Sequence, residues 1–458
     1  MTALARLQVL LGSQVPLVVV GGAVRDRLLG RIQGDVDLAT PLLPEDLMAQ
    51  AKAAGIRTIP TGLQHGTVTL VVEGVTFEVT TFRGDGDYRD GRRPEAVRLG
   101  VALEEDLARR DFTVNAMAVP LEDWLAGSMD RALLDPFGGR GDLQARCLRA
   151  VGDPGVRFQE DGLRPLRGCR LVAQLGFDLD PETARAIPAR LDVVQKVAVE
   201  RVLVELTKLL TASEPARGLQ CLEATGLLDT LLPELRPQVG CEQNEHHAWP
   251  VWEHTLAVVS AARPTVAHRW AALLHDVGKP ESRTVGADGR VHFYRHELRS
   301  EALAGAILLR LKASRALQQE VLALVRHHGR VPEPSWSDGA CRRFLGRLQE
   351  DGLSLADWGA FREADLRGKG VDLRASLDGH RLAMSRLQAL VEAHPPLGTR
   401  DLALDGRALV ALSGRPPGPW VGALQRHLLG AVLDAPEVNT PGGLEPLVHG
   451  WLALHPEA

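Results

Sequence analysis

The sequence predicts an α+β protein, with a mixed α/β head followed by an all-helical body. The chain begins with a strand pattern at 16–20, a Gly-Gly turn, a helical pattern at 23–29 and a second strand pattern at 36–39. Two further strand patterns follow at 67–72 and 75–80. After Asp135–Arg140 the strand patterns cease, and Leu, Ala and Arg recur with helical periodicity nearly to the end of the chain.

The composition fits a water-soluble protein of two to four domains. The 458 residues are 45% hydrophobic and 24% charged, and only 4% are aromatic, so we expect mostly aliphatic cores. The net charge of −5 gives no overall basic character. Any RNA binding would therefore depend on local arginine clusters.

The cysteines and the N-terminal segment predict a cytoplasmic protein. The five cysteines are scattered and form no CxxC pair, which fits free thiols in a reducing compartment. The apolar stretches within residues 1–22 are too short to span a bilayer and lack a cleavage-site pattern. We therefore expect no membrane partner.

Proline-rich stretches divide the helical body. Leu232–Pro237 and His394–Gly398 mark boundaries on either side of a histidine-rich middle segment. Together with the end of the strand patterns, they predict four parts, at 1–142, 143–235, 236–375 and 376–458.

The segment after the first predicted strand has the residue types of phosphoryl-transfer chemistry. Gly22, at a strand-to-helix turn, would let backbone N–H groups approach a triphosphate, and Arg25 would add a charge-assisted contact. Asp35 and Asp37, two residues apart on the second predicted strand, would point to one face and hold Mg²⁺ as catalytic carboxylates. A lone glycine pair or acidic pair is more often a simple turn or a solvated surface, but their combination favours catalysis.

Two further motifs make the head resemble the bacterial CCA-adding enzymes and related poly(A) polymerases, which are polymerase-β-like nucleotidyltransferases. Arg109–Ala118 reads RRDFTVNAMA and matches their RRDFTxNA motif, which is associated with ribose and nucleotide contacts. Glu160–Arg164 reads EDGLR and matches their EDxxR motif, whose Asp and Arg act as a protein template for C or A. The resemblance therefore assigns base choice to Asp161 and Arg164. It implies nucleotide binding by Arg109, Arg110, Asp111, Asn115 and Glu160. Arg164, Arg167 and Arg170 recur every three residues as one basic stripe along a helix, which is either a solvated face or, beside Glu160 and Asp161, a nucleotide-binding one.

Two local features bear on the expected substrates. Tyr88–Pro94 resembles the flexible loop of CCA-adding and A-adding enzymes, which enzymes that add only CC lack. The sequence after Asp37 lacks the GRRF-like run of bacterial poly(A) polymerases, so the resemblance implies tRNA as primer and CTP and ATP as substrates. Glu78, near the end of a predicted strand, is either a third carboxylate of this site or a solvated residue.

The segment between residues 246 and 365 is rich in metal-ligand residue types. Neutral imidazoles and carboxylates bind divalent metals, which lower the pKa of water enough for attack on a phosphate ester. The run Ala271–Lys279 reads AALLHDVGK and resembles the HD phosphohydrolase superfamily. The resemblance implies a divalent metal of unknown identity, with ligands at His254, His275, Asp276 and Asp365 and the extra ligands of two-metal members at His296, His327 and His328. Similar domains in some bacterial CCA-adding enzymes are credited with phosphatase, 2′-nucleotidase and 2′,3′-cyclic phosphodiesterase activities.

The resemblance also gives the four predicted parts their roles. They become a nucleotidyltransferase head, a helical nucleotide-recognition neck, an HD phosphohydrolase domain and a helical tRNA-binding tail. In the tail, Arg407, Arg415 and Arg426 are candidate phosphate contacts. Three alternatives stay open: an A-adding enzyme that works with a separate CC-adding partner, a poly(A) polymerase, and an HD phosphohydrolase with a non-catalytic RNA-binding head. The sequence does not predict the oligomeric state.

Overall fold

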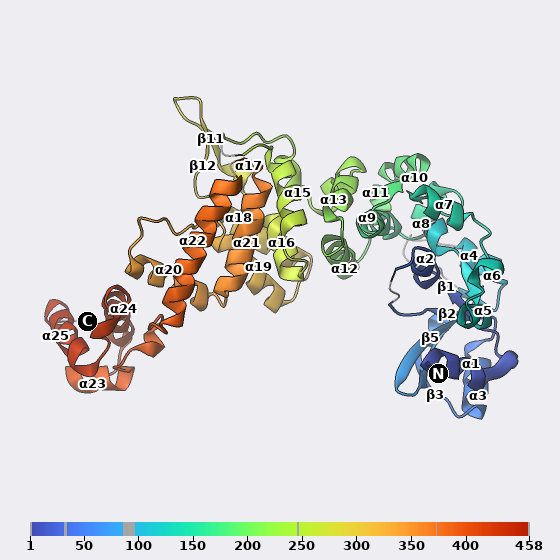
Figure 1. The fold of residues 1–458 in the computed structure, drawn as a ribbon, viewed down its shortest axis with the longest axis horizontal. Coiled ribbons are helices and arrows are strands. Elements are labelled where there is room, and N and C mark those ends of the chain that lie inside the picture. The colour runs from blue at the N-terminus through green and yellow to red at the C-terminus, as the bar shows by residue number, and fades with distance from the viewer. Residues whose placement is uncertain (1, 32–33, 86–96, 245–246, 372, 457–458) are drawn as a thin grey trace. The chain divides into compact units, whose positions relative to one another are not determined.

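The structure, a computed structural model, describes residues 2–31, 34–85, 97–244, 247–371 and 373–456. The chain forms two compact units, Met1–Pro233 and Glu234–Ala458 (Figure 1). A mixed sheet lies in the first unit and the second is almost entirely helical. The predicted fold class is therefore confirmed, and the finer division into four parts stays a prediction.

A six-stranded sheet forms the centre of the head. Its strand order is β3 (Arg57–Gly62), β4 (Thr67–Val72), β5 (Val75–Thr81), β2 (Leu38–Thr40), β1 (Val18–Val20) and β8 (Ala118–Pro120). Only β2 and β5 are parallel, and the other neighbours are antiparallel. Because Leu38 pairs with Val79, the residue before β2 lies beside Glu78 on β5.

The predicted strands at 67–72 and 75–80 agree with β4 and β5 to within one residue. The placement of Asp35 and Asp37 on a strand was wrong, since β2 begins only at Leu38. The pairing of β2 with β5 starts at Leu38, and both aspartates precede it on exposed backbone. The peptide carbonyl of Asp37 still accepts a hydrogen bond from Val20 N at 3.1 Å, which ties the segment to β1.

The turn between β1 and the helix α2 (Gly22–Leu28) requires glycine. Gly21 has φ 71°, which side-chain-bearing residues rarely adopt. A Cβ atom there would also lie 2.9 Å from a guanidinium nitrogen of Arg110. The other helices of the head are α1 (Ala3–Leu11), α3 (Pro44–Ala53), α4 (Leu103–Ala108), α5 (Leu121–Ala126), α6 (Met129–Ala132) and α7 (Gly139–Ala145), and the 3₁₀ turn η3 spans Thr113–Asn115. The strands β6 (Arg83–Asp85) and β7 (Val97–Leu99) form a separate antiparallel pair.

The helices after the head pack mainly on α9 (Arg164–Leu175). The others are α8 (Pro154–Glu160), α10 (Pro181–Ala186), α11 (Leu191–Val194), α12 (Val199–Leu210), α13 (Pro215–Ala224) and α14 (Leu227–Leu231). Helices α12 and α13 contact α9 along its buried apolar side. The expectation that strands end with the head was wrong in detail, because β9 (Cys147–Leu148) and β10 (Asp178–Leu179) pair here. Two-residue strands are too short to show a period-two pattern.

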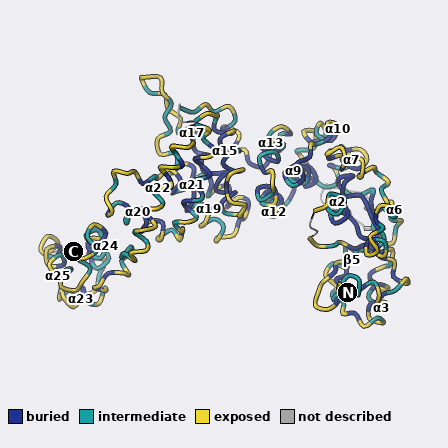
Figure 2. Tube along the Cα trace, in the orientation of Figure 1, coloured by how far each residue is buried: buried dark blue, intermediate teal, exposed yellow. Residues whose placement is uncertain are grey.

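The second unit has a helical core around Trp270, Trp358 and Phe361, all fully buried. Figure 2 shows that buried residues gather where its central helices meet. These helices are α15 (Val251–Ala261), α16 (Val266–Leu274), α18 (His296–Arg310), α19 (Arg315–His327), α20 (Asp338–Glu350), α21 (Leu355–Gly368) and α22 (Leu373–Glu392). The short α17 (Lys279–Ser282) and the hairpin of β11 (Arg283–Val285) and β12 (Val291–Phe293) connect α16 to α18.

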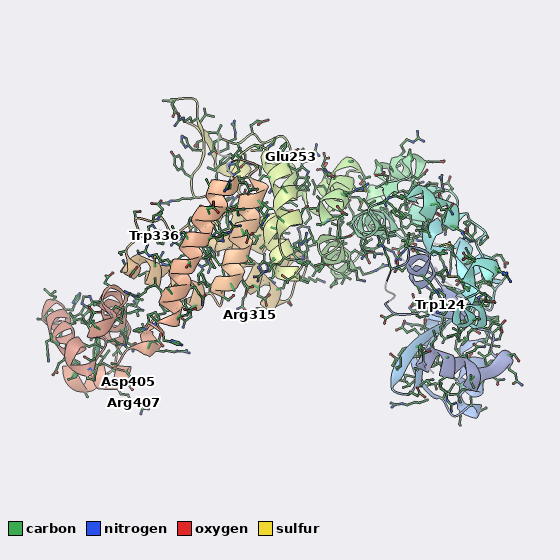
Figure 3. The ribbon with its side chains drawn as sticks, viewed as in Figure 1. Trp124, Glu253, Arg315, Trp336, Asp405 and Arg407 are labelled. Carbon is green, nitrogen blue, oxygen red and sulfur yellow. The ribbon has the colours of Figure 1, made fainter. Side chains whose placement is uncertain are left out.

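Three helices at the end of the chain surround a separate small core. They are α23 (Gly406–Ser413), α24 (Pro419–Asp434) and α25 (Pro441–Leu454), and they bury Leu409, Leu424 and Leu444 completely. Asp405 caps α23, and the exposed Arg407 lies in its first turn (Figure 3). Among the described residues, none of the helices combines the length and the apolar composition that a bilayer span requires.

Candidate active sites

Three carboxylates gather at one place on the sheet of the head. Asp35 and Asp37 precede β2, and the parallel register places Glu78 of β5 next to them. Partial burial and the negative charges of Glu78 and Asp35 raise the pKa of Asp37, while the positive charge of Arg110 opposes the increase. Carboxylates that repel one another in this way fit a divalent cation, for which carboxylate oxygens are the preferred ligands. The short sequence spacing revealed the two aspartates, but only the strand register brings in Glu78.

A hydrogen-bonded chain of side chains connects the glycine turn to helix α9. Arg25 binds Asp26 through two nitrogens, at 2.8 and 3.0 Å, and its Nη1 donates to Asn115 Oδ1 at 2.7 Å. Asn115 Nδ2 donates to Asp111 Oδ1 at 3.2 Å, and Asp111 Oδ2 pairs with Arg167 at 2.7 Å. Burial favours a neutral Asp111, but Arg167 and the hydrogen bond from Asn115 hold its pKa below the ordinary value. The RRDFTVNA motif thus forms the middle of this chain.

Asp106 anchors the two arginines that begin the same motif. Its Oδ1 lies 2.8 Å from Arg109 Nη2, and its Oδ2 lies 3.0 Å from Arg110 Nη2. The carboxylate is buried, which alone would raise its pKa, yet the two guanidinium groups lower it. Sequence analysis missed Asp106, although its position three and four residues before the arginines on a helical pattern is the spacing that brings such side chains together.

The EDGLR segment forms hydrogen bonds at the start of α9. Asp161 accepts from Arg201 Nη2 at 3.1 Å and from the backbone N of Leu163 at 3.0 Å. The buried Arg164 pairs with Glu160 and donates to the peptide oxygen of Arg109 at 2.7 Å. The structure therefore joins this segment to the RRDFTVNA motif.

The arginine stripe of α9 is not a solvated face. Arg167 pairs with Asp111, and Arg170 pairs with the buried Glu205 of α12 at 2.5 Å. The stripe therefore fixes α9 against the head and α12. The predicted loop Tyr88–Pro94 lies outside the described residues.

In the second unit, six side chains form two adjacent groups of three. One group is His254, His275 and Asp365, the other is Asp276, His296 and His328, and within each group the candidate ligand atoms lie within 4.8 Å of one another. Asp276 lies between the groups. Its Oδ2 is 3.1 Å from His275 Nε2 and 3.4 Å from His254 Nε2, while its Oδ1 is 3.3 Å from His296 Nε2.

Backbone carbonyls orient three of the four imidazoles. In each of these Nδ1 lies against a backbone carbonyl, which only accepts hydrogen bonds, so Nδ1 carries a hydrogen and Nε2 is the atom that faces the candidate metal site. These pairs are His275 with Ala272 O at 2.9 Å, His296 with Phe293 O at 3.0 Å and His328 with Val325 O at 2.6 Å. The Nε2 atoms of His254 and His275 are only 3.2 Å apart in a fully buried setting. This donor set fits divalent metals.

His327 lies apart from both groups. Its Nε2 is 2.7 Å from Asp351 Oδ2, and burial lowers its pKa despite this partner. Its peptide oxygen accepts a hydrogen bond from Trp358 Nε1 at 3.1 Å. The structure therefore brings His328 to the candidate metal site and points His327 to the other side of α19, because successive residues near a helix end lie about 100° apart around its axis.

A cavity of about 240 Å³ opens on the second group of ligands. Besides Asp276, His296, His328 and Asp365, it is lined by three cationic side chains that sequence analysis missed, namely Lys279, Arg362 and Lys369. Lys279 Nζ lies 2.7 Å from Asp276 Oδ2, and Arg362 pairs with Asp365. No described group accepts a hydrogen bond from Lys369 Nζ, and burial lowers the pKa of this amine. Such cations fit the oxygens of a phosphate.

The sequence matches three families along its length. They are the Poly A polymerase head domain at residues 17–149, the Probable RNA and SrmB- binding site of polymerase A at 176–239, and the HD domain at 251–360. A CCA-adding enzyme of Geobacillus thermodenitrificans (strain NG80-2) is 37% identical over 439 residues, covering 94% of this chain and 91% of that protein. The chain belongs to the family of CCA-adding enzymes. The CCA-adding enzyme of Geobacillus stearothermophilus is 35% identical over 447 residues, with coverage of 94% and 91%.

Solved structures of CCA-adding enzymes have the same fold. The Bacillus stearothermophilus CCA-adding enzyme in complex with CTP aligns with a TM-score of 0.71 and 30% identity, over 99% of this chain and 98% of that chain. The Thermotoga maritima CCA-adding enzyme complexed with tRNA_CCA aligns with a TM-score of 0.53 and 19% identity, over 98% and 95%, which supports the fold alone. The predicted resemblance to CCA-adding enzymes with an HD domain is confirmed, and the roles of individual residues stay predictions.

We predict that Asp106→Asn destabilises the first unit by about 3 kcal/mol at pH 7, because two half-buried arginines lose their buried counter-charge. The folded pKa of Asp106 is lowered, so its contribution is full above the unfolded pKa of about 4 and is lost as pH falls through the folded value. Urea unfolding of both proteins from pH 7 down to pH 3 should show the stability difference shrink only at the acid end. Glu104→Gln, on the exposed side of α4, is the control. A difference that is constant across this range would contradict the assignment.

We predict opposite effects for the two adjacent histidines. His328→Ala should lower the metal content of the purified protein, measured by elemental analysis, because it removes a candidate ligand. His327→Ala should leave the metal content unchanged and reduce stability by about 1 kcal/mol, because Asp351 loses its hydrogen bond to His327 and keeps only Arg326. Equal loss of metal in both variants would show that His327 is a ligand after all.

Proposed function

We propose that this protein builds or repairs the 3′-terminal CCA of tRNA from CTP and ATP without a nucleic-acid template. The observation that carries the proposal is the cluster of Asp35, Asp37 and Glu78 beside the Gly21–Gly22 turn. Membership in the CCA-adding enzymes supports it, as does a relative of the same fold whose structure was solved in complex with CTP. An A-adding specialist has the same head chemistry and is distinguished by its products.

The head would hold Mg²⁺ on Asp35 and Asp37, with Glu78 as a third carboxylate. Bound there, Mg²⁺ would supply Lewis-acid stabilisation of the charge on the phosphates. Gly22 leaves the N-terminus of α2 open to a triphosphate, since a Cβ atom would already lie 3.4 Å from Arg25 Nη2. Arg25 and Arg110 would balance the charge of the triphosphate. The tRNA 3′-hydroxyl then attacks the α-phosphate and pyrophosphate leaves.

Asp161 and Arg164 would read the incoming base, with Asp161 offering acceptors and Arg164 offering donors. The partners of these side chains fix their orientation. Arg201 holds one oxygen of Asp161, and the peptide oxygen of Arg109 holds the Arg164 guanidinium. The incoming base would form hydrogen bonds with side chains that the protein holds in place, so its selection needs no template strand.

We further propose that the HD domain is a metal-dependent phosphohydrolase. His254, His275 and Asp365 would hold one metal, His296 and His328 a second, and Asp276 would serve both. A divalent metal there would activate water and polarise the phosphorus centre. Lys279, Arg362 and Lys369 would bind the phosphate oxygens, and the carbonyl-bound Nδ1 atoms keep the imidazoles oriented. The candidate substrates are phosphomonoesters and 2′,3′-cyclic phosphates.

Two single substitutions test whether the chain has two independent centres. Asp35→Ala should abolish incorporation of labelled CTP and ATP into tRNA and leave hydrolysis of 2′,3′-cyclic AMP within about twofold of the unaltered protein. Asp276→Ala should do the reverse, so each variant is the folding control for the other. Loss of both activities in either variant would contradict independent centres. Retention of incorporation in Asp35→Ala would reject the proposed catalytic carboxylates.

The base-reading proposal predicts a change in selectivity for Asp161→Ala. Losing a charge-assisted hydrogen bond should reduce the preference between CTP and ATP at a defined primer end by about tenfold or more, as a ratio of kcat/KM values. Asp192→Ala, at an exposed position in α11, should leave the ratio unchanged. If Asp161→Ala lowers both kcat/KM values equally, Asp161 binds nucleotide without choosing the base.

A further inference from the structure

The cavity of the HD domain contains a carboxylate that neither metal binding nor phosphate binding uses. Among the described residues that line it, Glu297 is the only carboxylate outside the two groups of candidate metal ligands. Its Oε2 lies 3.8 Å from His296 Nδ1, the ring nitrogen that faces away from the candidate metal site. No described group donates a hydrogen bond to either oxygen, and the side chain is 31% exposed. Glu297 therefore borders the cavity without belonging to the ligand set.

The chain after α19 leaves room for this side chain. Gly329 lines the same cavity, and a Cβ atom there would overlap the Glu297 carboxylate and lie 2.8 Å from its Cγ. Gly329 does not have a positive φ, so its backbone conformation does not require glycine. An acidic residue in the first turn of α18 also favours the helix dipole, but that effect needs neither a cavity nor a neighbouring glycine. The fit points to a role for the carboxylate inside the cavity.

A carboxylate without a partner is unfavourable beside a bound phosphate. The cations Lys279, Arg362 and Lys369 line this cavity and attract phosphate oxygens, whereas the carboxylate repels them. An ionised carboxylate only accepts hydrogen bonds, so it fits the site where the same ligand offers an uncharged donor. Because the cavity is only about 240 Å³, that donor must lie close to the phosphate. In a ribose 2′- or 3′-phosphate, the hydroxyl on the neighbouring carbon meets this requirement.

We propose that Glu297 accepts a hydrogen bond from the free hydroxyl next to the phosphate of a ribose 2′- or 3′-phosphate. The ligand class is a ribonucleotide with such a phosphomonoester, either free or at the end of an RNA. A 2′-deoxyribose 3′-phosphate lacks this hydroxyl, as does a 2′,3′-cyclic phosphate. The inference rests on the proposed phosphohydrolase function and adds its specificity. Glu297 is therefore a specificity-determining residue that selects the sugar, while the cations hold the phosphate.

A pair of substrates tests the hydrogen bond directly. Glu297→Ala should lower kcat/KM for adenosine 3′-phosphate about tenfold or more and should not lower it for 2′-deoxyadenosine 3′-phosphate, which has no donor to lose. Glu297→Gln keeps an acceptor oxygen and should retain part of the preference for ribose. The control Glu281→Ala removes an exposed carboxylate outside the cavity and should change neither value. An equal loss with both substrates, or no preference for ribose in the unaltered protein, would overturn the proposal.

Binding gives a measurement that needs no catalysis. The 3′-phosphonomethyl analogues of the two nucleotides cannot be hydrolysed, and each is titrated into the metal-loaded protein by calorimetry. Glu297→Ala should weaken binding of the analogue with a 2′-hydroxyl about tenfold and should not weaken binding of the 2′-deoxy analogue. The metal content of Glu297→Ala, measured by elemental analysis, should equal that of the unaltered protein. A loss of metal would show that Glu297 is a ligand and would contradict the proposal.

The outcomes separate this proposal from the function on which it rests. If the unaltered protein hydrolyses phosphomonoesters and Glu297→Ala affects both sugars equally, the phosphohydrolase stands and the specificity proposal fails. If the unaltered protein hydrolyses none of them, the phosphohydrolase proposal fails and this one fails with it. Short RNAs that end in a 3′-phosphate on ribose or on 2′-deoxyribose repeat the comparison. A Glu297 effect with the RNAs alone, or with the free nucleotides alone, identifies the source of the phosphate.

Discussion

Each of the two centres gathers groups that repel one another unless a cation lies between them. In the head, Asp35, Asp37 and Glu78 place negative charge where β2 begins beside β5. The raised pKa of Asp37 reflects partial burial together with repulsion from the other two carboxylates. In the second unit, the buried carboxylates of Asp276 and Asp365 lie 3.4 and 3.3 Å from the same atom, His254 Nε2. Arrangements of this kind are unfavourable by themselves, so the rest of the fold must hold them in place.

The two units hold their functional side chains in place by different structural means. In the head it is the strand register, because the parallel pairing of Leu38 with Val79 sets Glu78 beside the segment that carries both aspartates. In the second unit it is the geometry at the ends of helices. Backbone carbonyls accept the Nδ1 hydrogens of His275, His296 and His328, which fixes both the tautomer and the ring orientation. Both centres therefore depend on backbone geometry more than on contacts between ligands.

Ion pairs connect the nucleotide-binding motifs of the first unit to one another. Asp106 holds Arg109 and Arg110, Asp111 holds Arg167, and Glu205 holds Arg170. The carboxylates of these pairs are buried. The pairs link the head to α9 and α9 to α12, so they fix the segment that carries Asp161 and Arg164 with respect to the glycine turn. The arginines of the motifs thus have a structural role in addition to any contact with a nucleotide.

The sequence alone predicted those features of the fold and of the two sites that a short residue pattern specifies. It predicted the strands at 67–72 and 75–80, the helical body, the glycine turn and the residue types of both sites. It was incomplete where partners come from distant elements. It left Glu78 open between a third carboxylate and a solvated residue, since only the strand register brings Glu78 to the aspartates. It missed Lys369, which joins the cavity only through the packing of α21. His327 and His328 are adjacent in sequence, but at the end of α19 their side chains point in different directions, which a linear motif does not show.

The central claim is that the chain completes the whole CCA end. The most direct test is incorporation of labelled CTP and ATP into three tRNA transcripts, which end at the discriminator base, after one C and after CC. We expect addition of CCA, CA and A, respectively. Addition of A to the CC-ending transcript alone would contradict the claim and identify an A-adding specialist. Failure to extend any transcript would leave the HD domain as the active part of the protein.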